Sequence, residues 1–296
     1  MIDFRHQSFL KLCQIRNYTK TAEKLHITQP TVSQHIKHLE EYYGVKLFNY
    51  SGKKLKLTNA GKKLYQYTER MIADSKEIKK SISKKSAEQN IKFGATLSIG
   101  EFVMPDILNQ AMEENKKLNF NMLVENTETL LQKLKTGEIN FAVLEGFFDK
   151  TKFGYHLFSK EKFIGICSAG SNLSEQKIKM DELLNSRLIL RENGSGTREI
   201  LEQILYTNNL NPKSFTSTIE IGNLNAIKAL VAEDKGISFM YQAAAKRDLN
   251  ADKISALNIE DFNIQREFNF VYLKDSVFAE EYLKCFELLI NLREKN

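Results

Sequence analysis

One short stretch near the start of this 296-residue chain constrains its fold more than any other. It reads TAEKLHITQPTVSQHIKHLEEYYG, from Thr21 to Gly44, and holds two helical patterns separated by a break. Thr28 can cap the second helix, Pro30 fits its first turn, and Gly44 can end it in a left-handed conformation. The stretch therefore predicts a helix-turn-helix whose second helix has a defined start and end.

The second of these helices has one apolar and one polar face. Val32, Ile36 and Leu39 recur at helical spacing and define the buried face. The polar side is rich in hydrogen-bonding groups and poor in acids, and its candidate DNA contacts are Gln29, Pro30, Thr31, Ser33, Gln34 and Lys37. A helix of this size can enter a DNA major groove. For the two helices alone, packing in an ordinary protein core is the competing interpretation.

A basic hairpin and an uneven charge distribution favour DNA binding. The segment VKLFNYSGKKLKLT predicts two strands around a Ser51-Gly52 turn, with Lys53 and Lys54 placed to contact phosphates. Residues 1–90 carry 18 Lys and Arg against 8 Asp and Glu, a balance of +10, whereas residues 91–296 carry 25 against 29, a balance of −4. Only residues 1–90 are therefore expected to bind a polyanion.

A single long helix is expected to follow the hairpin, from Asn59 to about Lys85. Its apolar residues form one stripe near coiled-coil spacing: Leu64, Tyr67, Met71, Ile78 and Ile82. The stripe could pair with a second copy of the chain or pack against its own domain. The polar remainder of the helix favours pairing. The following SKKSAEQN is typical of a hinge.

From Ile91 the pattern changes to short apolar runs alternating with helical segments. Such alternation predicts an α/β domain with mostly parallel strands. We therefore divide the chain into residues 1–58, a linker helix over 59–88, and a domain over 91–296 that is long enough for two lobes.

Three turns in this domain place small and hydroxyl-bearing residues between a strand and a helix. They lie in GATLSIG, RENGSGTRE and EIGNLNA, and supply the candidate ligand contacts Thr96, Ser98, Ser195, Gly196, Thr197 and Gly222. Free N–H groups at helix starts favour anions, although ordinary capping would select the same residue types. Glu145, after the apolar run FAVL, could bind an amine in the same cleft or face solvent.

The first 65 residues also resemble a known family. The resemblance rests on Ala22-Glu23-Lys24-Leu25, Thr28-Gln29-Pro30-Thr31-Val32-Ser33, Leu39-Glu40, Gly44-Val45, Leu47-Phe48 and Ala60-Gly61. In this order they are similar to the DNA-binding domain of LysR-type transcriptional regulators. Tyr50 departs from the pattern, because the family usually has an arginine there that contacts phosphate. Lys53 could supply that charge instead.

The resemblance implies an α/β architecture in three parts: a winged helix-turn-helix, a linker helix and a two-lobed effector domain similar to the type 2 periplasmic-binding-protein fold. Lobe one would span 91–160 and 266–296, and lobe two 161–265. The family further implies an inverted-repeat operator in double-stranded DNA, a small-molecule effector, and a homodimer or homotetramer. RNA polymerase would be a partner if the protein activates transcription. The turns described above indicate an anionic effector.

Other classes of protein fit the sequence less well. The three cysteines, Cys13, Cys167 and Cys285, are far apart, so we expect core thiols rather than a disulfide, and neither a metal nor a cofactor is expected. His35 and His38 are expected to face solvent or DNA. No signal peptide or membrane span is evident, which predicts a cytoplasmic protein. The sequence shows no coherent set of acid–base or nucleophilic residues that would indicate an enzyme. The alternative is a ligand-binding module or enzyme with an appended DNA-binding domain.

Overall fold

The computed structural model describes residues 3–52, 54–83, 89–114 and 118–294. The chain forms two compact units. The first contains the elements from α1 to α4 together with two short segments, Lys135–Glu138 and Asp275–Phe278. The second contains the elements from β3 onward. No helix among the described residues is long and apolar enough to cross a membrane.

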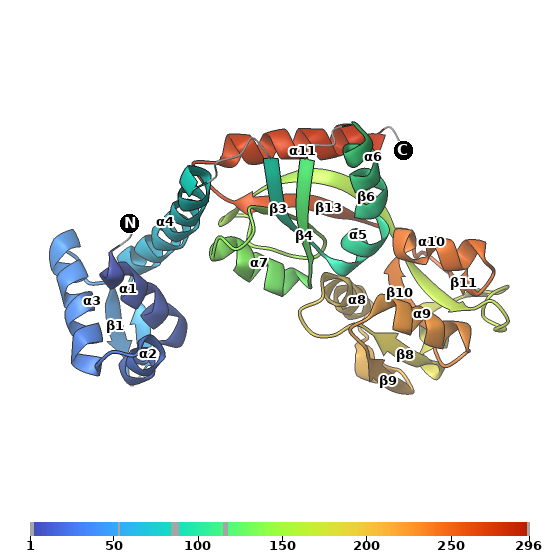
Figure 1. Ribbon diagram of the computed structural model, residues 1–296. Coiled ribbons are helices and arrows are strands. Elements are labelled where there is room, and N and C mark those ends of the chain that lie inside the picture. The colour runs from blue at the N-terminus through green and yellow to red at the C-terminus, as the bar shows by residue number, and fades with distance from the viewer. Residues whose placement is uncertain (1–2, 53, 84–88, 115–117, 295–296) are drawn as a thin grey trace. The chain divides into compact units, whose positions relative to one another are not determined.

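The first unit begins with three helices packed around one core (Figure 1). They are α1 (Phe4–Ile15), α2 (Tyr18–Leu25) and α3 (Gln29–Tyr43). Phe9 and Leu12 of α1 are fully buried, and Ile36 and Leu39 of α3 belong to the same core. The predicted end of α3 is confirmed, since Gly44 adopts the left-handed conformation with φ 66°.

The hairpin consists of β1 (Phe48–Ser51) and β2 (Lys54–Leu57), paired antiparallel. Gly52 turns between them with φ 62°, which explains the glycine at this position. The alternating apolar residues of VKLFNYSGKKLKLT predict one buried side of the hairpin, and Leu47 and Leu55 are buried, but Val45 is 45% exposed. Val45 lies before the first strand, directly after the helix end at Gly44, so the strand alternation does not reach it.

Helix α4 (Asn59–Ser83) follows the hairpin and is capped by Thr58, whose hydroxyl accepts from the Gly61 N–H at 2.9 Å. A Cβ on Gly61 would lie 2.1 Å from the Leu47 carbonyl oxygen, so this close approach requires glycine. Within the same unit, Arg70 pairs with Asp275 at 3.0 Å. The expected helix end near Lys85 and the hinge after it fall largely on residues 84–88, outside the described part of the chain.

The predicted stripe on α4 divides into two parts. Leu64 packs against the core of the first unit. The rest of the stripe is exposed: Tyr67, Met71, Ile78 and Ile82. At 100° per residue these four side chains fall within an arc of about 60°. The helix therefore presents a narrow apolar surface whose side chains are largely exposed.

The second unit is built on a sheet with strand order β10-β6-β13-β5-β3-β4, with β11 also paired to β6. Its strands are β3 (Gln89–Ala95), β4 (Leu118–Val124), β5 (Phe141–Leu144), β6 (Phe153–Ser168), β10 (Ser238–Tyr241), β11 (Ile254–Ala256) and β13 (Ile264–Leu273). Two smaller sheets pair β8 (Arg187–Leu190) with β9 (Ser217–Glu220), and β7 (Lys177–Ile178) with β12 (Asn258–Ile259). The predicted α/β class is confirmed.

The expectation of mostly parallel strands is wrong for the large sheet. Strand β3 is parallel to β4 and β5, but β13 is antiparallel to both β5 and β6, and β10 and β11 are antiparallel to β6. The reason is the long pair β6 and β13, which runs continuously between the two lobes. In that pair Lys160 lies opposite Glu267, and Lys162 opposite Gln265. The two expected lobe boundaries, near residues 160 and 265, therefore lie on adjacent strands.

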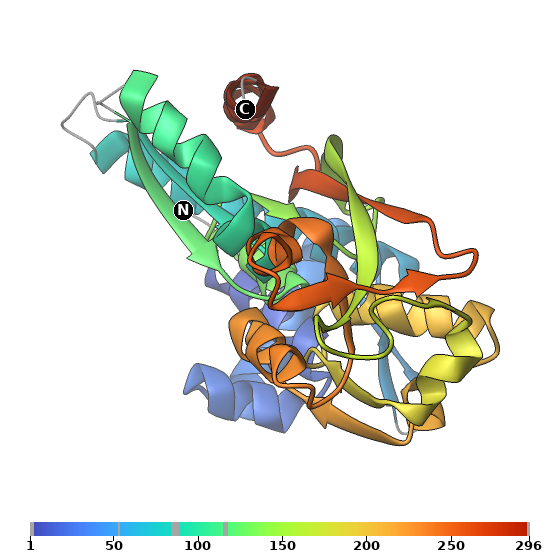
Figure 2. The same ribbon diagram turned by 90° about the vertical axis from the view of Figure 1, so that its right-hand side faces the viewer.

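The helices of the second unit are α5 (Leu97–Phe102), α6 (Met104–Glu114), α7 (Thr127–Lys135), α8 (Gly196–Thr207), α9 (Leu224–Ala232), α10 (Gln242–Asn250) and α11 (Ala279–Glu294), with 3-10 turns at Met180–Asn185 and Pro212–Ser214. Helices α8, α9 and α10 gather with β8 and β10 apart from β3, β4 and α7 (Figures 1 and 2). These two groups are the lobes of the effector domain.

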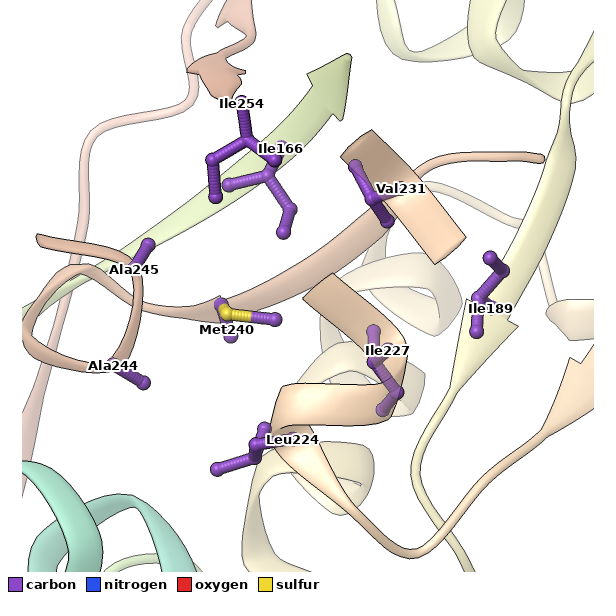
Figure 3. Close-up of a cluster of buried hydrophobic side chains, with 9 residues drawn as sticks. All are labelled: Ile166, Ile189, Leu224, Ile227, Val231, Met240, Ala244, Ala245 and Ile254. Atoms are coloured by element: carbon purple, nitrogen blue, oxygen red, sulfur yellow. The ribbon is translucent and has the colours of Figure 1, made fainter. Parts of the chain in front are cut away.

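Lobe two has its own apolar core between α9, α10 and the strands (Figure 3). Its centre consists of Ile166, Ile189, Leu224, Ile227, Val231, Met240, Ala244, Ala245 and Ile254. Leu97 and Phe102 of α5 pack against this core. Helix α5 therefore joins the lobes, and the residues around its start lie at the boundary between them.

Candidate functional sites

The polar face of α3 begins at a well-defined helix cap. The Thr28 hydroxyl accepts a hydrogen bond from the Thr31 backbone N–H at 3.3 Å, and Pro30 occupies the first turn. Val32 is fully buried, as predicted for the opposite face. The cap and the buried face fix both the start and the rotation of the helix, and so fix which side chains point outward.

The predicted DNA contacts of α3 share one surface but differ in exposure. Gln29, Pro30, Gln34 and Lys37 are exposed, whereas Thr31 and Ser33 are half-buried. Gln29 donates to the Ser33 hydroxyl at 2.9 Å, and Lys37 lies 3.7 Å from Glu41 in an exposed pair. Exposed pairs of this kind contribute little to stability, so Lys37 can exchange Glu41 for a phosphate at small cost.

His35 differs from its expected role. Its Nδ1 lies 2.8 Å from the Ser8 hydroxyl, and its ring packs edge-on against Phe4 at 4.9 Å between centroids. Burial lowers the pKa of His35. The side chain therefore joins α1 to α3, while His38 is exposed as expected. The polar pattern of α3 could not separate these two histidines.

The hairpin of β1 and β2 is the wing of the winged helix-turn-helix. It is held in place by Glu40, an acid whose role the sequence did not reveal. The Glu40 carboxylate accepts from the Leu47 N–H at 2.9 Å and from Lys46 at 2.6 Å. Lys54 and Tyr50 are exposed on the hairpin, whereas Lys53 lies outside the described residues. Glu40 thus orients the start of the wing relative to α3.

The second candidate site surrounds Glu145, directly after β5. The carboxyl group is fully buried and accepts hydrogen bonds from three hydroxyls. Thr96 donates to Oε2, and Ser98 and Thr197 donate to Oε1 at 3.4 and 3.2 Å. Thr127 donates to the Glu145 carbonyl oxygen at 2.9 Å. The structure thus brings together four residues that the sequence proposed separately, from both lobes.

Electrostatics distinguish this carboxyl from a surface acid. Burial raises the pKa of Glu145 from 4.5 to about 7, although the Arg191 guanidinium and the hydroxyls of Thr197 and Ser98 lower it. No cation forms a salt bridge with Glu145 among the described residues, because Arg191 pairs with Glu192 at 2.8 Å. The site therefore holds a desolvated acid whose charge is only partly compensated.

Several buried polar atoms near this site have no partner among the described residues. They are Arg191 Nη1, Ser195 Oγ and Tyr241 Oη. Arg191 and Tyr241 both interact electrostatically with Glu145. Unpaired buried polar groups are costly, so they indicate a place for a polar ligand or water. Sequence analysis proposed Ser195 but missed Arg191, which follows β8 and begins the stretch RENGSGTRE, and Tyr241, the last residue of β10. A sequence does not show which buried atoms lack partners.

Two glycines bring the lobes into contact beside Glu145. A Cβ on Gly146 would lie 2.7 Å from the Gly196 Cα, and a Cβ on Gly196 would lie 2.6 Å from the Glu145 carbonyl oxygen. Gly196 therefore permits the start of α8 to approach β5. Gly222 differs from the other proposed residues, because its nearest neighbour is the Glu192 carboxylate, 3.5 Å from an added Cβ.

The remaining candidates have structural roles. Cys13 and Cys167 are buried and Cys285 is half-buried, and all three are free thiols. Burial raises the pKa of Cys167 and of Cys285 to about 11, which makes both poor nucleophiles. No cluster of potential metal ligands occurs among the residues that the structure describes.

The winged helix-turn-helix and the two-lobed domain define a class of protein: a DNA-binding transcription regulator with an effector domain. Comparison with protein families agrees. Residues 5–62 match the bacterial regulatory helix-turn-helix proteins of the lysR family, and residues 84–290 match the LysR substrate binding domain. The chain belongs to the LysR family of transcriptional regulators, as its sequence motifs predicted.

Individual relatives extend the match over nearly the whole chain. The transcriptional regulator CysL of Bacillus subtilis is 29% identical over 272 residues, covering 90% of this chain and 89% of CysL. An OxyR mutant of Corynebacterium glutamicum has the same fold, with a TM-score of 0.62 at 20% identity, covering 99% of this chain and 91% of OxyR. The CcmR regulatory domain of Synechocystis, solved with 2-PG, has a TM-score of 0.63 at 18% identity, covering 70% of this chain and 98% of that domain. CysL is named as a transcriptional regulator, and together with the family match this confirms the prediction of a regulator rather than an enzyme.

Proposed function

We propose that the protein binds an inverted-repeat operator as a homodimer. The observation that carries this proposal is the exposed polar face of α3, held by the Thr28 cap and flanked by the wing. Gln29 and Gln34 would contact base edges, with Thr31 and Ser33 beside them, and Lys37, Lys53 and Lys54 would contact phosphates. Two copies related by a twofold axis would read two half-sites of opposite orientation.

The exposed stripe on α4 is the proposed dimer contact. Tyr67, Met71, Ile78 and Ile82 lie along one line of the helix and are 43% to 79% exposed. Pairing two such helices removes these side chains from water. Contacts between effector domains would extend the dimer to a tetramer, and an activator would also contact RNA polymerase.

The proposed effector is a small metabolite with an acidic group, bound between the lobes. Two independent features support an anion there. Helix α8 has no side-chain cap at its N-terminus, so N–H groups of its first turn remain available. Arg191 Nη1 and Ser195 Oγ, both buried, lack partners close to the same turn. The binding of 2-PG by the CcmR domain is consistent with a ligand site in this fold.

Selection from fragmented genomic DNA tests the operator proposal. Fragments bound by the full-length protein should share one inverted repeat, and a variant carrying Gln34→Ala should enrich that repeat less. Recovery of fragments with no common motif, or with a single unpaired half-site, would contradict the proposal.

A further inference from the structure

The groups that surround Glu145 do not suit a simple anion. Thr96, Ser98 and Thr197 would be the hydrogen-bond donors for such an anion, yet all three donate to the Glu145 carboxyl. An anion placed against them would also lie beside a buried acid. Two like charges in contact repel strongly at a buried position, where the effective dielectric is low. The hydroxyl cluster is therefore committed to Glu145.

The same geometry leaves the Glu145 carboxyl short of positive charge. Three neutral hydroxyls compensate it, and the raised pKa reflects the cost of burial. Arg191 lowers the pKa of Glu145 through its charge, but its Nε and Nη2 are bonded to Glu192 at 2.8 and 2.9 Å. A ligand cation would lower this cost directly, since buried charges are favourable only when paired.

Other groups of the site remain as free donors for an acidic group. Arg191 Nη1 and Ser195 Oγ are buried without partners, and the first turn of α8 has no side-chain cap. Arg198 does not join them, because it donates to Glu202 at 2.8 Å and pairs with Glu220. The site thus offers Glu145 as an acceptor for a cation, and Arg191, Ser195 and the start of α8 as separate donors for an anion.

The other polar and charged groups described around the site do not change this arrangement of one acceptor and separate donors. Tyr241 at the end of β10 has a buried, unpaired hydroxyl that can accept from a cation or donate to an acid. Arg266 and Glu161 have opposite effects on the pKa of Tyr241: the charge of Arg266 lowers it and that of Glu161 raises it. Near the glycine contact, Glu199 is held by the Phe147 N–H, and Glu128 lies beside Gly194. None of these groups supplies a cation bonded to Glu145.

We propose that the effector is a zwitterion of the amino-acid type, with its ammonium group bonded to Glu145 and its carboxylate bonded to Arg191, Ser195 and the start of α8. This inference rests on the proposed effector site between the lobes and specifies its ligand. The ammonium group lies in hydrogen-bond reach of Glu145 and Tyr241. The carboxylate takes the donors that the folded chain leaves free. Binding of both groups connects β5 of lobe one with α8 of lobe two.

Thermal unfolding of the full-length protein with matched compounds tests the inference. The probes are the twenty L-amino acids, their 2-hydroxy acids without the ammonium group, and their decarboxylated amines. At least one amino acid should raise the unfolding temperature saturably, with its hydroxy acid and its amine each bound more than about tenfold more weakly, as expected for loss of a charged hydrogen bond. Glu145→Gln should reduce the preference for amino over hydroxy acid to less than about threefold.

Glu199→Gln is the matched control, because this exposed acid lies beside Gly146, close to Glu145, and none of the hydroxyls that bond Glu145 bonds it. The preference of this variant for the amino acid should equal that of the unchanged protein. Equal binding of the amino acid and its hydroxy acid would overturn the zwitterion while leaving an anionic effector in place. Failure of all three compound classes to bind would also overturn the zwitterion, and a titration with inorganic sulfate and phosphate would then test the anionic effector separately. An unchanged preference in Glu145→Gln would remove Glu145 from the site.

Discussion

Three hydroxyl groups surround the carboxyl of Glu145, and none of them carries a charge that offsets its burial. The sequence placed Thr96, Ser98 and Thr197 at helix starts and proposed that they bind a ligand or cap helices. In the structure they bond an acid from another strand. Only the fold brings these residues together, since 49 and 52 positions separate Glu145 from Thr96 and Thr197.

Glu145→Gln should change how stability depends on pH. The pKa of Glu145 is about 7 in the folded protein against an ordinary value of 4.5, so the folded state binds this proton more tightly than the unfolded state. Its contribution to stability is therefore complete below pH 4.5 and is lost as the pH rises through about 7, a change of about 3 kcal/mol. Urea unfolding of both proteins across this range measures it. Parallel profiles for the two proteins would contradict the prediction.

Gln34→Ala should weaken operator binding and relax one base preference. The side chain is exposed on the polar face of α3, and loss of a bidentate base contact costs about 1–3 kcal/mol. Fluorescence anisotropy at fixed salt gives the affinity for the operator and for single-base variants. Gln66→Ala, an exposed glutamine on α4, is the control and should leave both unchanged. Full operator affinity in Gln34→Ala would exclude Gln34 as a contact.

At the scale of elements, whether a helix or strand could be predicted from the sequence depended on how many residues its periodic pattern spans. Helix α3 was predicted with its cap and its buried face, because fifteen residues carry several turns of signal. Helix α5 was missed, since its six residues LSIGEF show no clear period. The first half of β6 was missed as well, because Gly154 to Lys162 mixes exposed and buried residues without a continuous apolar run.

Lys54→Ala should weaken binding to operator and random DNA alike. Lys54 is exposed on β2 of the wing, and a phosphate contact carries no sequence information. The slope of log affinity against log salt should become shallower by about one unit. Lys213→Ala, an exposed lysine in lobe two, should leave the slope unchanged. If only one operator sequence were affected by Lys54→Ala, the wing would read bases instead.

Met71→Asp with Ile78→Asp should dissociate the dimer. Both side chains are nearly half exposed in the apolar stripe of α4, and two charges there would be buried in each pairing helix. Sedimentation should show a shift toward monomer, with an unchanged circular dichroism spectrum. Gln66→Asp, about 120° away on the same helix, should keep the dimer. A dimer that survives the double change would place the contact elsewhere.

At the scale of the whole molecule, the sequence predicted the family, the α/β class and the two-lobed domain, because its motifs are local and its strand and helix periods are long enough to read. It did not predict the antiparallel pairing of β6 with β13, since pairing direction is a long-range property. Nor did it find Arg191 or Tyr241, whose importance depends on unpaired buried atoms. The division into residues 1–58, 59–88 and 91–296 stays a prediction.

A hydroxyl-radical footprint on the selected operator tests the central claim most directly. Two copies of α3 in successive major grooves should protect two half-sites of an inverted repeat on one face of the duplex, with centres separated by about 34 Å or a multiple of it. Gln34→Ala removes one contact of the polar face. It should weaken the protection of both half-sites equally, because each subunit of a symmetric dimer uses the same helix. A single asymmetric footprint, or protection that does not depend on α3, would contradict the account.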